Sequence, residues 1–173
     1  MDSLRALAVL GRTPTLFAEH LRALVETTGS LEAAASIGPQ GVPGVMLTPS
    51  ARVFLAAPDN RAIDADIEWI HASNAKLIPC TSAQYPALLA NTSRAPAVLY
   101  VLGDETALLS PQLAIVGSRS PTASGRDTAR HFAEFFARTG IAITSGLALG
   151  IDAASHEGAL LAPGGVTIAV CGT

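Results

Sequence analysis

The pattern of apolar and polar positions divides the chain in two near residue 72. The first part carries repeated helix-start signals, each followed by a short stretch of apolar residues at helical spacing. We therefore predict a small module of short helices over residues 1–72. The predicted starts are Thr13-Pro14, Ser30, Thr48-Pro49, and either Asn60 or Asp64.

The second part begins at Lys76–Cys80, where short apolar runs begin to alternate with helical segments. This alternation is typical of βαβ units and predicts an α/β fold with a mainly parallel sheet over residues 73–173. The predicted strands, given below, are fewer than the five or six of a complete doubly wound sheet. We therefore expect an incomplete sheet and a truncated chain. The predicted strands are 97–101, 113–116, 141–144 and 166–171, with helices near 82–90, 126–139 and 152–161.

The clearest candidate site follows the apolar run Leu113–Val116, which predicts a fully buried strand. A glycine, a hydroxyl and a guanidinium come directly after this strand, and a turn then leads into a helix. Backbone N–H groups near a helix start, together with a hydroxyl and an arginine, are suited to binding phosphate. The candidate phosphate-binding residues are Gly117, Ser118, Arg119 and Gly125, with Arg126 as a supporting residue.

A second group of polar residues follows the next predicted strand. Ser145 and Gly146 end that strand, and open α/β sheets bind ligands at the carboxyl ends of their strands. Gly146 and Gly150 are expected to permit a positive φ or the close approach of a ligand to the backbone. Asp152 and His156 lie one helical turn apart. They form either an acid–base pair or a helix cap with a hydrogen-bonded neighbour, and both interpretations stay open.

Composition narrows the class of protein. Apolar residues make up 49% of the chain and charged residues 14%, which suits a packed domain, and no apolar run approaches the roughly 20 residues of a membrane helix. The two cysteines have neither metal-binding nor disulfide spacing. We therefore predict a cytoplasmic protein without membrane contact, metal or cofactor.

Charge and motifs limit the chemistry further. A net charge of −3 excludes a protein that coats nucleic acid by charge alone, but residues 111–140 hold four arginines against two acidic residues. Gly117 is not followed by the further glycines of a dinucleotide fingerprint, and no G-x-S-x-G motif surrounds Ser145. His156 lacks the second histidine of a zinc helix. We expect no catalytic residue.

The ordered motifs resemble the DprA (Smf) family of DNA-processing proteins over roughly residues 76–173. The stretch Ala114–Arg119, with Pro121, Thr122 and Gly125, is similar to the family's first phosphate-site motif. The second motif is matched by Ser145–Ala148, Gly150–Asp152, His156 and Gly158–Leu160. Further similar segments are Tyr85–Leu89, Pro96–Gly103 and Gly164–Val170.

The resemblance implies an incomplete Rossmann-like sheet preceded by a small helical module of the SAM or helix-hairpin kind. It implies a non-enzymatic protein that binds single-stranded DNA, partners the recombinase RecA and supports natural transformation. Full-length family members self-associate, and we expect that surface to be missing here. Leu149 and Glu157 stand where the family often has a basic residue, which removes positive charge. The implied DNA phosphate site is Gly117, Ser118, Arg119, Gly125, Ser145 and Gly146, supported by Arg126, Asp152 and His156.

Two alternatives to DNA binding stay open. One is a nucleotide-binding enzyme that hydrolyses nucleoside phosphates, for which Asp152 or Glu157 is the local candidate acid or base. The other is an inert product that aggregates through an open sheet edge.

Overall fold

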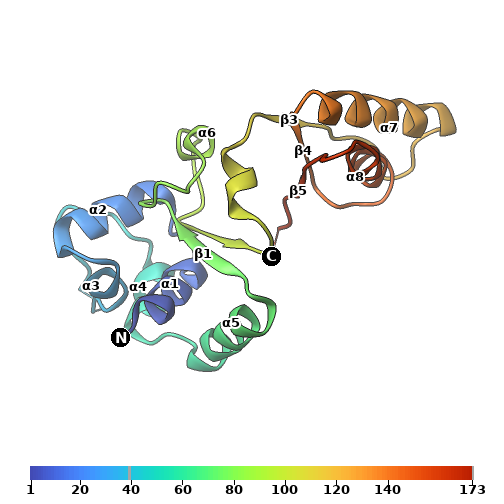
Figure 1. Cartoon of the computed structure of the whole chain (residues 1–173). Helices are drawn as coiled ribbons and strands as arrows, with labels where there is room; N and C mark the ends of the chain where they lie inside the picture. The colour runs from blue at the N-terminus through green and yellow to red at the C-terminus, as the bar shows by residue number, and fades with distance from the viewer. Residues whose placement is uncertain (39, 173) are drawn as a thin grey trace. The chain divides into compact units, whose positions relative to one another are not determined.

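The computed structural model describes residues 1–38 and 40–172 (Figure 1). The chain forms two compact units, Met1–Glu105 and Thr106–Thr173. The 3-10 helix η1 (Glu105–Leu109) spans the point of division. This division lies downstream of the predicted domain boundary at residues 72 and 73, which stays a prediction.

The first unit begins with five short helices, four of which start at a side-chain cap. Each cap is an Asp, Ser or Thr oxygen that accepts a hydrogen bond from a backbone N–H three residues later, which satisfies one of the free donors at a helix start. The helices are α1 (Ser3–Arg12), α2 (Ala18–Thr28), α3 (Leu31–Ala35), α4 (Pro49–Ala56) and α5 (Asn60–Ser73). The capping residues are Asp2, Ser30, Thr48 and Asp59.

Sequence reasoning found four of these helices and missed α1. The predicted starts at Ser30 and Thr48-Pro49 are confirmed, and α5 begins at Asn60. The start predicted at Thr13-Pro14 is displaced, because α2 begins only at Ala18. The residue before it, Phe17, forms an antiparallel bridge with Pro96.

The first two strands pair with each other and not with the parallel sheet. β1 (Lys76–Pro79) and β2 (Val98–Val101) are antiparallel. The prediction that residues 97–101 join a parallel sheet is therefore wrong. Parallel strands are usually joined by a crossover helix, whereas the segment between these two strands forms only the short helix α6 (Ala87–Ala90). A hydrogen bond of 2.9 Å from Cys80 N–H to the Ala97 carbonyl follows the same antiparallel course.

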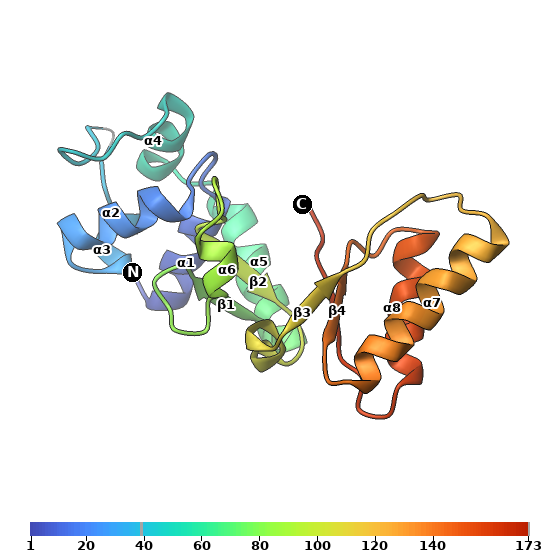
Figure 2. The ribbon, with the colours of Figure 1, turned by 90° about the horizontal axis from the view of Figure 1, so that it is seen from above.

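The second unit contains the parallel sheet that the sequence predicts. β3 (Gln112–Ala114), β4 (Ala142–Ser145) and β5 (Thr167–Ala169) lie in that order and run parallel. Each successive pair is joined by a helix, α7 (Ala123–Arg138) and then α8 (Ile151–Leu161). The two helices lie side by side against the sheet (Figure 2). This βαβαβ arrangement is one half of a doubly wound Rossmann-like sheet, so the predicted fold class is confirmed.

Small side chains let the two helices of the second unit pack closely. A Cβ at Gly158 of α8 would lie 2.2 Å from the Arg130 carbonyl oxygen of α7, so only glycine fits at this contact. Partly buried Leu113, Ile115 and Phe136 pack against the core. The fully enclosed residues of this core are Ala133, Ala137, Ile143, Ala159 and Ala162.

The prediction of a fully buried strand over Leu113–Val116 is wrong. β3 lies at the edge of the sheet, and the side chain of Val116 is 76% exposed. Side chains alternate between the two faces of a strand, so Leu113 and Ile115 reach the helices while Ala114 does not. An apolar run thus marks an edge strand that is covered on one face only.

An ionic network centred on Asp66 joins three elements of the first unit. Arg12 of α1 donates two hydrogen bonds to the Asp66 carboxylate of α5, with N–O distances of 2.6 and 2.7 Å. The Tyr100 hydroxyl of β2 donates a third, at 2.8 Å. Burial opposes ionisation of Asp66, but the hydrogen bonds from Arg12 and Tyr100 outweigh it, so the pKa of Asp66 lies below its usual value.

We expect Asp66→Asn to destabilise the first unit by about 1–2 kcal/mol at pH 7, because the charged acceptor is lost. A lowered pKa in the folded state contributes stability that is complete above the unfolded-state pKa of about 3.9 and is lost as the pH falls through the folded value. The variant should therefore lose less stability than the parent chain between neutral and acid pH. Urea unfolding followed by the fluorescence of Trp69, the chain's one tryptophan, measures both effects.

Asp64→Asn is the matched control on the same helix. Asp64 pairs with Arg5 at 2.6 Å, but its side chain is 57% exposed, so its loss should change stability by less than about 0.5 kcal/mol. Equal effects of the two substitutions would contradict the importance of the Asp66 network.

Candidate functional site

The candidate site lies where β3 and β4 end, and hydrogen bonds hold these two strand ends together. Ile115 N–H donates to the Thr144 carbonyl at 3.0 Å. The buried Ser145 hydroxyl donates to the Ile115 carbonyl at 2.7 Å. Ser145 therefore ties the end of β4 to the chain leaving β3. Its one hydroxyl hydrogen is used inside the protein.

The loops that follow the two strands interlock by close backbone approach. A Cβ at Gly150 would lie 2.3 Å from the Ser118 carbonyl oxygen, and Gly150 also has a φ of +90°. A Cβ at Gly117 would lie 2.7 Å from the Ile151 side chain. Between these contacts the Ile151 N–H donates to the Ser118 carbonyl at 3.1 Å. The first N–H of α8 is thus satisfied by the protein. The predicted positive φ at Gly150 is confirmed, and the group that approaches this glycine is the protein's own backbone.

Asp152 faces the second loop from the first turn of α8. Its side chain is buried, and its Oδ2 accepts a long hydrogen bond of 3.4 Å from Ala148 N–H. A Cβ at Gly146 would lie 2.9 Å from the same oxygen, so Gly146 makes room for the carboxylate. Leu147 between them adopts a φ of +59°, which is uncommon for a residue with a side chain. Asp152 therefore supports this loop and places negative charge beside it.

His156 is bonded to Thr167 and not to Asp152. Its Nδ1 lies 2.6 Å from the Thr167 hydroxyl oxygen, and that hydroxyl donates its hydrogen to the Ile143 carbonyl at 2.8 Å. Nδ1 must then be the donor, which fixes the tautomer. The buried Nε2 has no hydrogen-bond partner among the described residues. Both interpretations of an Asp152–His156 pair are wrong, because β5 supplies the histidine's partner.

The start of α7 gathers the remaining polar groups of the first motif. Helix α7 begins at Ala123, earlier than the predicted 126–139, so Gly125 and Arg126 belong to its first turn. The Thr122 hydroxyl caps the helix by accepting from Gly125 N–H at 3.1 Å. Among the described residues, the N–H groups of Ala123 and Ser124 have no hydrogen-bond partner. Free N–H groups at a helix start attract anions.

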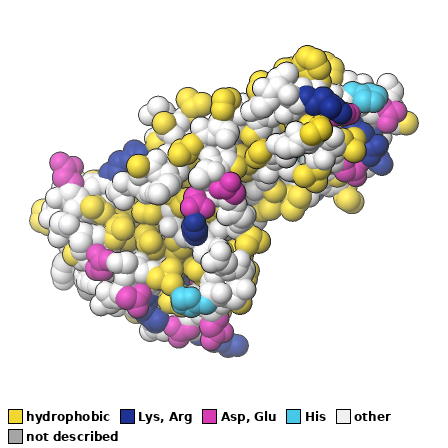
Figure 3. Space-filling view, viewed as in Figure 1, with side chains coloured by type: hydrophobic (Ala, Val, Ile, Leu, Met, Phe, Trp, Pro, Cys, Tyr) yellow, Lys and Arg dark blue, Asp and Glu magenta, His cyan; other side chains and the backbone are white. Residues whose placement is uncertain are grey.

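The arginines of the second unit fall into two kinds. Arg130 forms an ion pair with Glu157, and Arg138 pairs with Glu134 one turn before it. Arg119 and Arg126 are exposed, and neither has a carboxylate partner in residues 1–38 and 40–172. In the space-filling view the Lys and Arg side chains stand in small separate groups (Figure 3). Among the described residues of this unit, Arg119 and Arg126 thus lack the carboxylate partner that Arg130 and Arg138 have.

The structure thus brings together only part of the predicted site. Arg119 follows the interlocked loop, and Arg126 lies in the first turn of α7. Ser118 accepts a hydrogen bond from Ser120 N–H at 3.1 Å, which shapes the loop between them. Sequence reasoning missed the cap at Thr122, although Pro121-Thr122 before a helical pattern is a recognisable start signal.

Two other kinds of site are not found in the part of the chain that the structure describes. No group of three or more His, Cys, Asp or Glu side chains is placed to hold a metal ion. No helix there combines the length and apolar character needed to cross a membrane.

Comparisons with known proteins agree on one family. The sequence profile of the DNA recombination-mediator protein A family matches residues 76–173. Protein Smf of Escherichia coli K12 is 43% identical over 122 residues, which cover 70% of this chain and 32% of that protein. A putative DNA processing protein DprA of Mycobacterium tuberculosis is 32% identical over 183 residues, covering 96% of this chain and 45% of that protein. The chain therefore spans less than half the length of these relatives.

A solved structure supports the fold. The X-ray structure of DNA processing protein A (DprA) from Streptococcus pneumoniae superposes with a TM-score of 0.60 at 22% identity, over 96% of this chain and 56% of that one. The profile match covers more than half of the chain and includes β3, α7, β4 and α8, the elements that build the site. The chain belongs to the DNA recombination-mediator protein A family.

Proposed function

We propose that this chain binds single-stranded DNA by its phosphates at the start of α7. The observation that carries the proposal is that Arg119 and Arg126 are exposed and lack carboxylate partners among the described residues, while Arg130 and Arg138 are both paired. Guanidinium groups donate two hydrogen bonds in a fixed fork that fits phosphate oxygens. The free N–H groups of the first turn of α7 add donors at the same end of the helix.

The other residues around the predicted site hold the loops that carry the proposed phosphate site. Gly117 and Gly150 allow the loops to interlock, and the Ser118 carbonyl caps α8, so that Arg119 leaves a fixed backbone. Gly146 and Asp152 shape the second loop, Ser145 ties β4 to the chain that leaves β3, and His156 ties α8 to β5. These four residues do not contact the phosphate in this proposal. Gly125 lies in the first turn of α7, where its N–H donates to the capping Thr122 hydroxyl.

A role without chemical turnover fits the carboxylates near the site. Asp152 is buried against the Ala148 N–H, and Glu157 is paired with Arg130, so neither is placed as a free acid or base. No observation favours hydrolysis of nucleoside phosphates. A family of recombination mediators that grips DNA by its backbone can leave the bases open for pairing. We therefore propose that the strand is delivered to the RecA recombinase during homologous recombination and natural transformation.

Affinity for single-stranded DNA should fall with salt, and the slope should report each phosphate contact. Neutralising one contact changes the slope of log K against log salt by about 0.7 for a single strand. We expect Arg119→Ala and Arg126→Ala each to weaken binding and to make the slope shallower by about that amount. Fluorescence anisotropy of a labelled dT20 oligonucleotide over a range of NaCl concentrations measures both.

Arg138→Ala is the matched control, since Arg138 lies on the same helix but is bound to Glu134. The slope of log K against log salt for Arg138→Ala should equal that of the parent chain. If Arg119→Ala and Arg126→Ala also keep the parent slope, the phosphate site does not lie at the start of α7.

Gly150→Ala should weaken binding without touching either arginine. Its Cβ would collide with the Ser118 carbonyl, displacing the loop that carries Arg119. Gly164→Ala is the control, because Gly164 also has a positive φ, +69°, but has nothing within 4 Å of the added Cβ. We expect a loss of affinity for dT20 with Gly150→Ala well beyond that with Gly164→Ala. Equal losses would mean that backbone strain alone explains the effect.

A further inference from the structure

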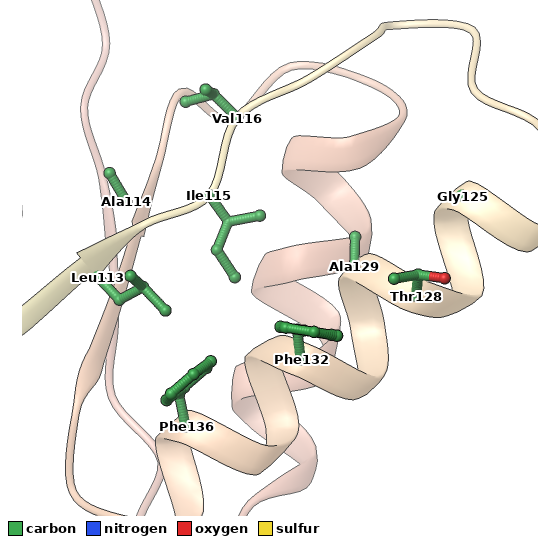
Figure 4. A pocket seen from close by; sticks show the side chains of 9 residues that line it. All are labelled: Leu113, Ala114, Ile115, Val116, Gly125, Thr128, Ala129, Phe132 and Phe136. Atoms are coloured by element: carbon green, nitrogen blue, oxygen red, sulfur yellow. The ribbon is translucent and has the colours of Figure 1, made fainter.

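Helix α7 carries two arginines as neighbours on its surface. Arg126 and Arg130 are one helical turn apart, so their Cβ atoms are separated by about 6 Å. Phe132 and Phe136 lie on another side of the helix, toward Leu113 of β3 (Figure 4). Arg126 is exposed and has no carboxylate partner among the described residues, whereas Arg130 forms an ion pair. A cation thus lies directly beside the proposed phosphate site, but it is already engaged.

The partner of Arg130 is held in place by the packing of α7 against α8. A Cβ at Gly158 would lie 2.2 Å from the Arg130 carbonyl oxygen and 3.0 Å from the Ala133 Cβ, so the two helices touch closely at this point. Glu157, the residue before that glycine, accepts a hydrogen bond from Arg130 Nη2 through its Oε2. The contact between the helices therefore keeps the Glu157 carboxylate beside Arg130.

This ion pair is open to an external anion. The side chains of Arg130 and Glu157 are 42% and 54% exposed, and both border a surface hollow of about 350 Å³. In the described part of the chain Arg130 donates one hydrogen bond to Glu157, whereas Arg138 donates two to Glu134. Exposed pairs of this kind are weak, because water solvates both charges. Breaking the pair therefore costs little and releases a guanidinium next to Arg126.

We propose that Glu157 withholds Arg130 from single-stranded DNA, and that Arg130 is a latent phosphate contact beside Arg126. The inference rests on the proposed phosphate site at the start of α7 and concerns the regulation of that site. A carboxylate offers a guanidinium the same kind of anionic oxygen as a phosphate does, so Glu157 competes with the strand from within the protein. The affinity for DNA is then set by an ion pair between two helices as well as by the unpaired arginines.

The test is Glu157→Gln, which keeps the size of the side chain and removes its charge. With Arg130 released, the affinity for labelled dT20 should rise about fivefold, which is the scale of one exposed ion pair. The slope of log K against log salt should become steeper by about 0.7, because one more phosphate contact releases its counterions. The double variant Arg130→Ala/Glu157→Gln should return both quantities to the parent values. Fluorescence anisotropy over a range of NaCl concentrations measures them.

Glu134→Gln is the matched control, because it also removes one negative charge from the second unit and releases an arginine. The released residue, Arg138, lies at the opposite end of α7 from Arg126, about 18 Å away along the helix axis. Glu134→Gln should therefore keep the slope of the parent chain. Circular dichroism of each variant verifies that the helices remain folded.

Three results would overturn the inference. If Glu157→Gln and Glu134→Gln steepen the slope equally, the effect comes from overall charge and Arg130 is not a phosphate contact. If Glu157→Gln binds dT20 like the parent chain while Arg119→Ala and Arg126→Ala make the slope shallower, the phosphate site stands but Glu157 does not regulate it. Failure of both the parent chain and Glu157→Gln to bind dT20 removes the proposed function as well.

Discussion

The site depends on the place where the loop after β3 and the start of α8 touch backbone to backbone. Gly150 lies so close to the Ser118 carbonyl that no side chain fits, and the Ile151 N–H completes the contact with a hydrogen bond. This contact uses the first N–H of α8 to fix protein structure, which is why we place the proposed phosphate site at the start of α7. A loop held in this way loses little entropy when Arg119 binds a ligand, which favours affinity.

Ion pairs within the second unit determine which of its arginines remain available for an anionic ligand. The second unit holds as many acidic as basic residues, so its long-range field cannot concentrate DNA. Glu157 pairs with Arg130, and Glu134 pairs with Arg138. Arg119 and Arg126 have no such partner among the described residues, and both are exposed near the start of α7. The resemblance to the DprA (Smf) family predicts a basic residue at position 157, whereas Glu157 is acidic and pairs with Arg130. Recognition therefore relies on local geometry.

The sequence predicts what local chemistry controls and fails where a distant partner decides. Caps at Ser30 and Thr48 act within three residues, so their helices could be placed from the sequence. The partners of β2 and His156 lie far along the chain, and both were predicted incorrectly. The close approach at Gly150 follows from glycine's lack of a side chain. The exposure of Val116 could not be predicted, because an apolar run does not say whether both faces of a strand are covered.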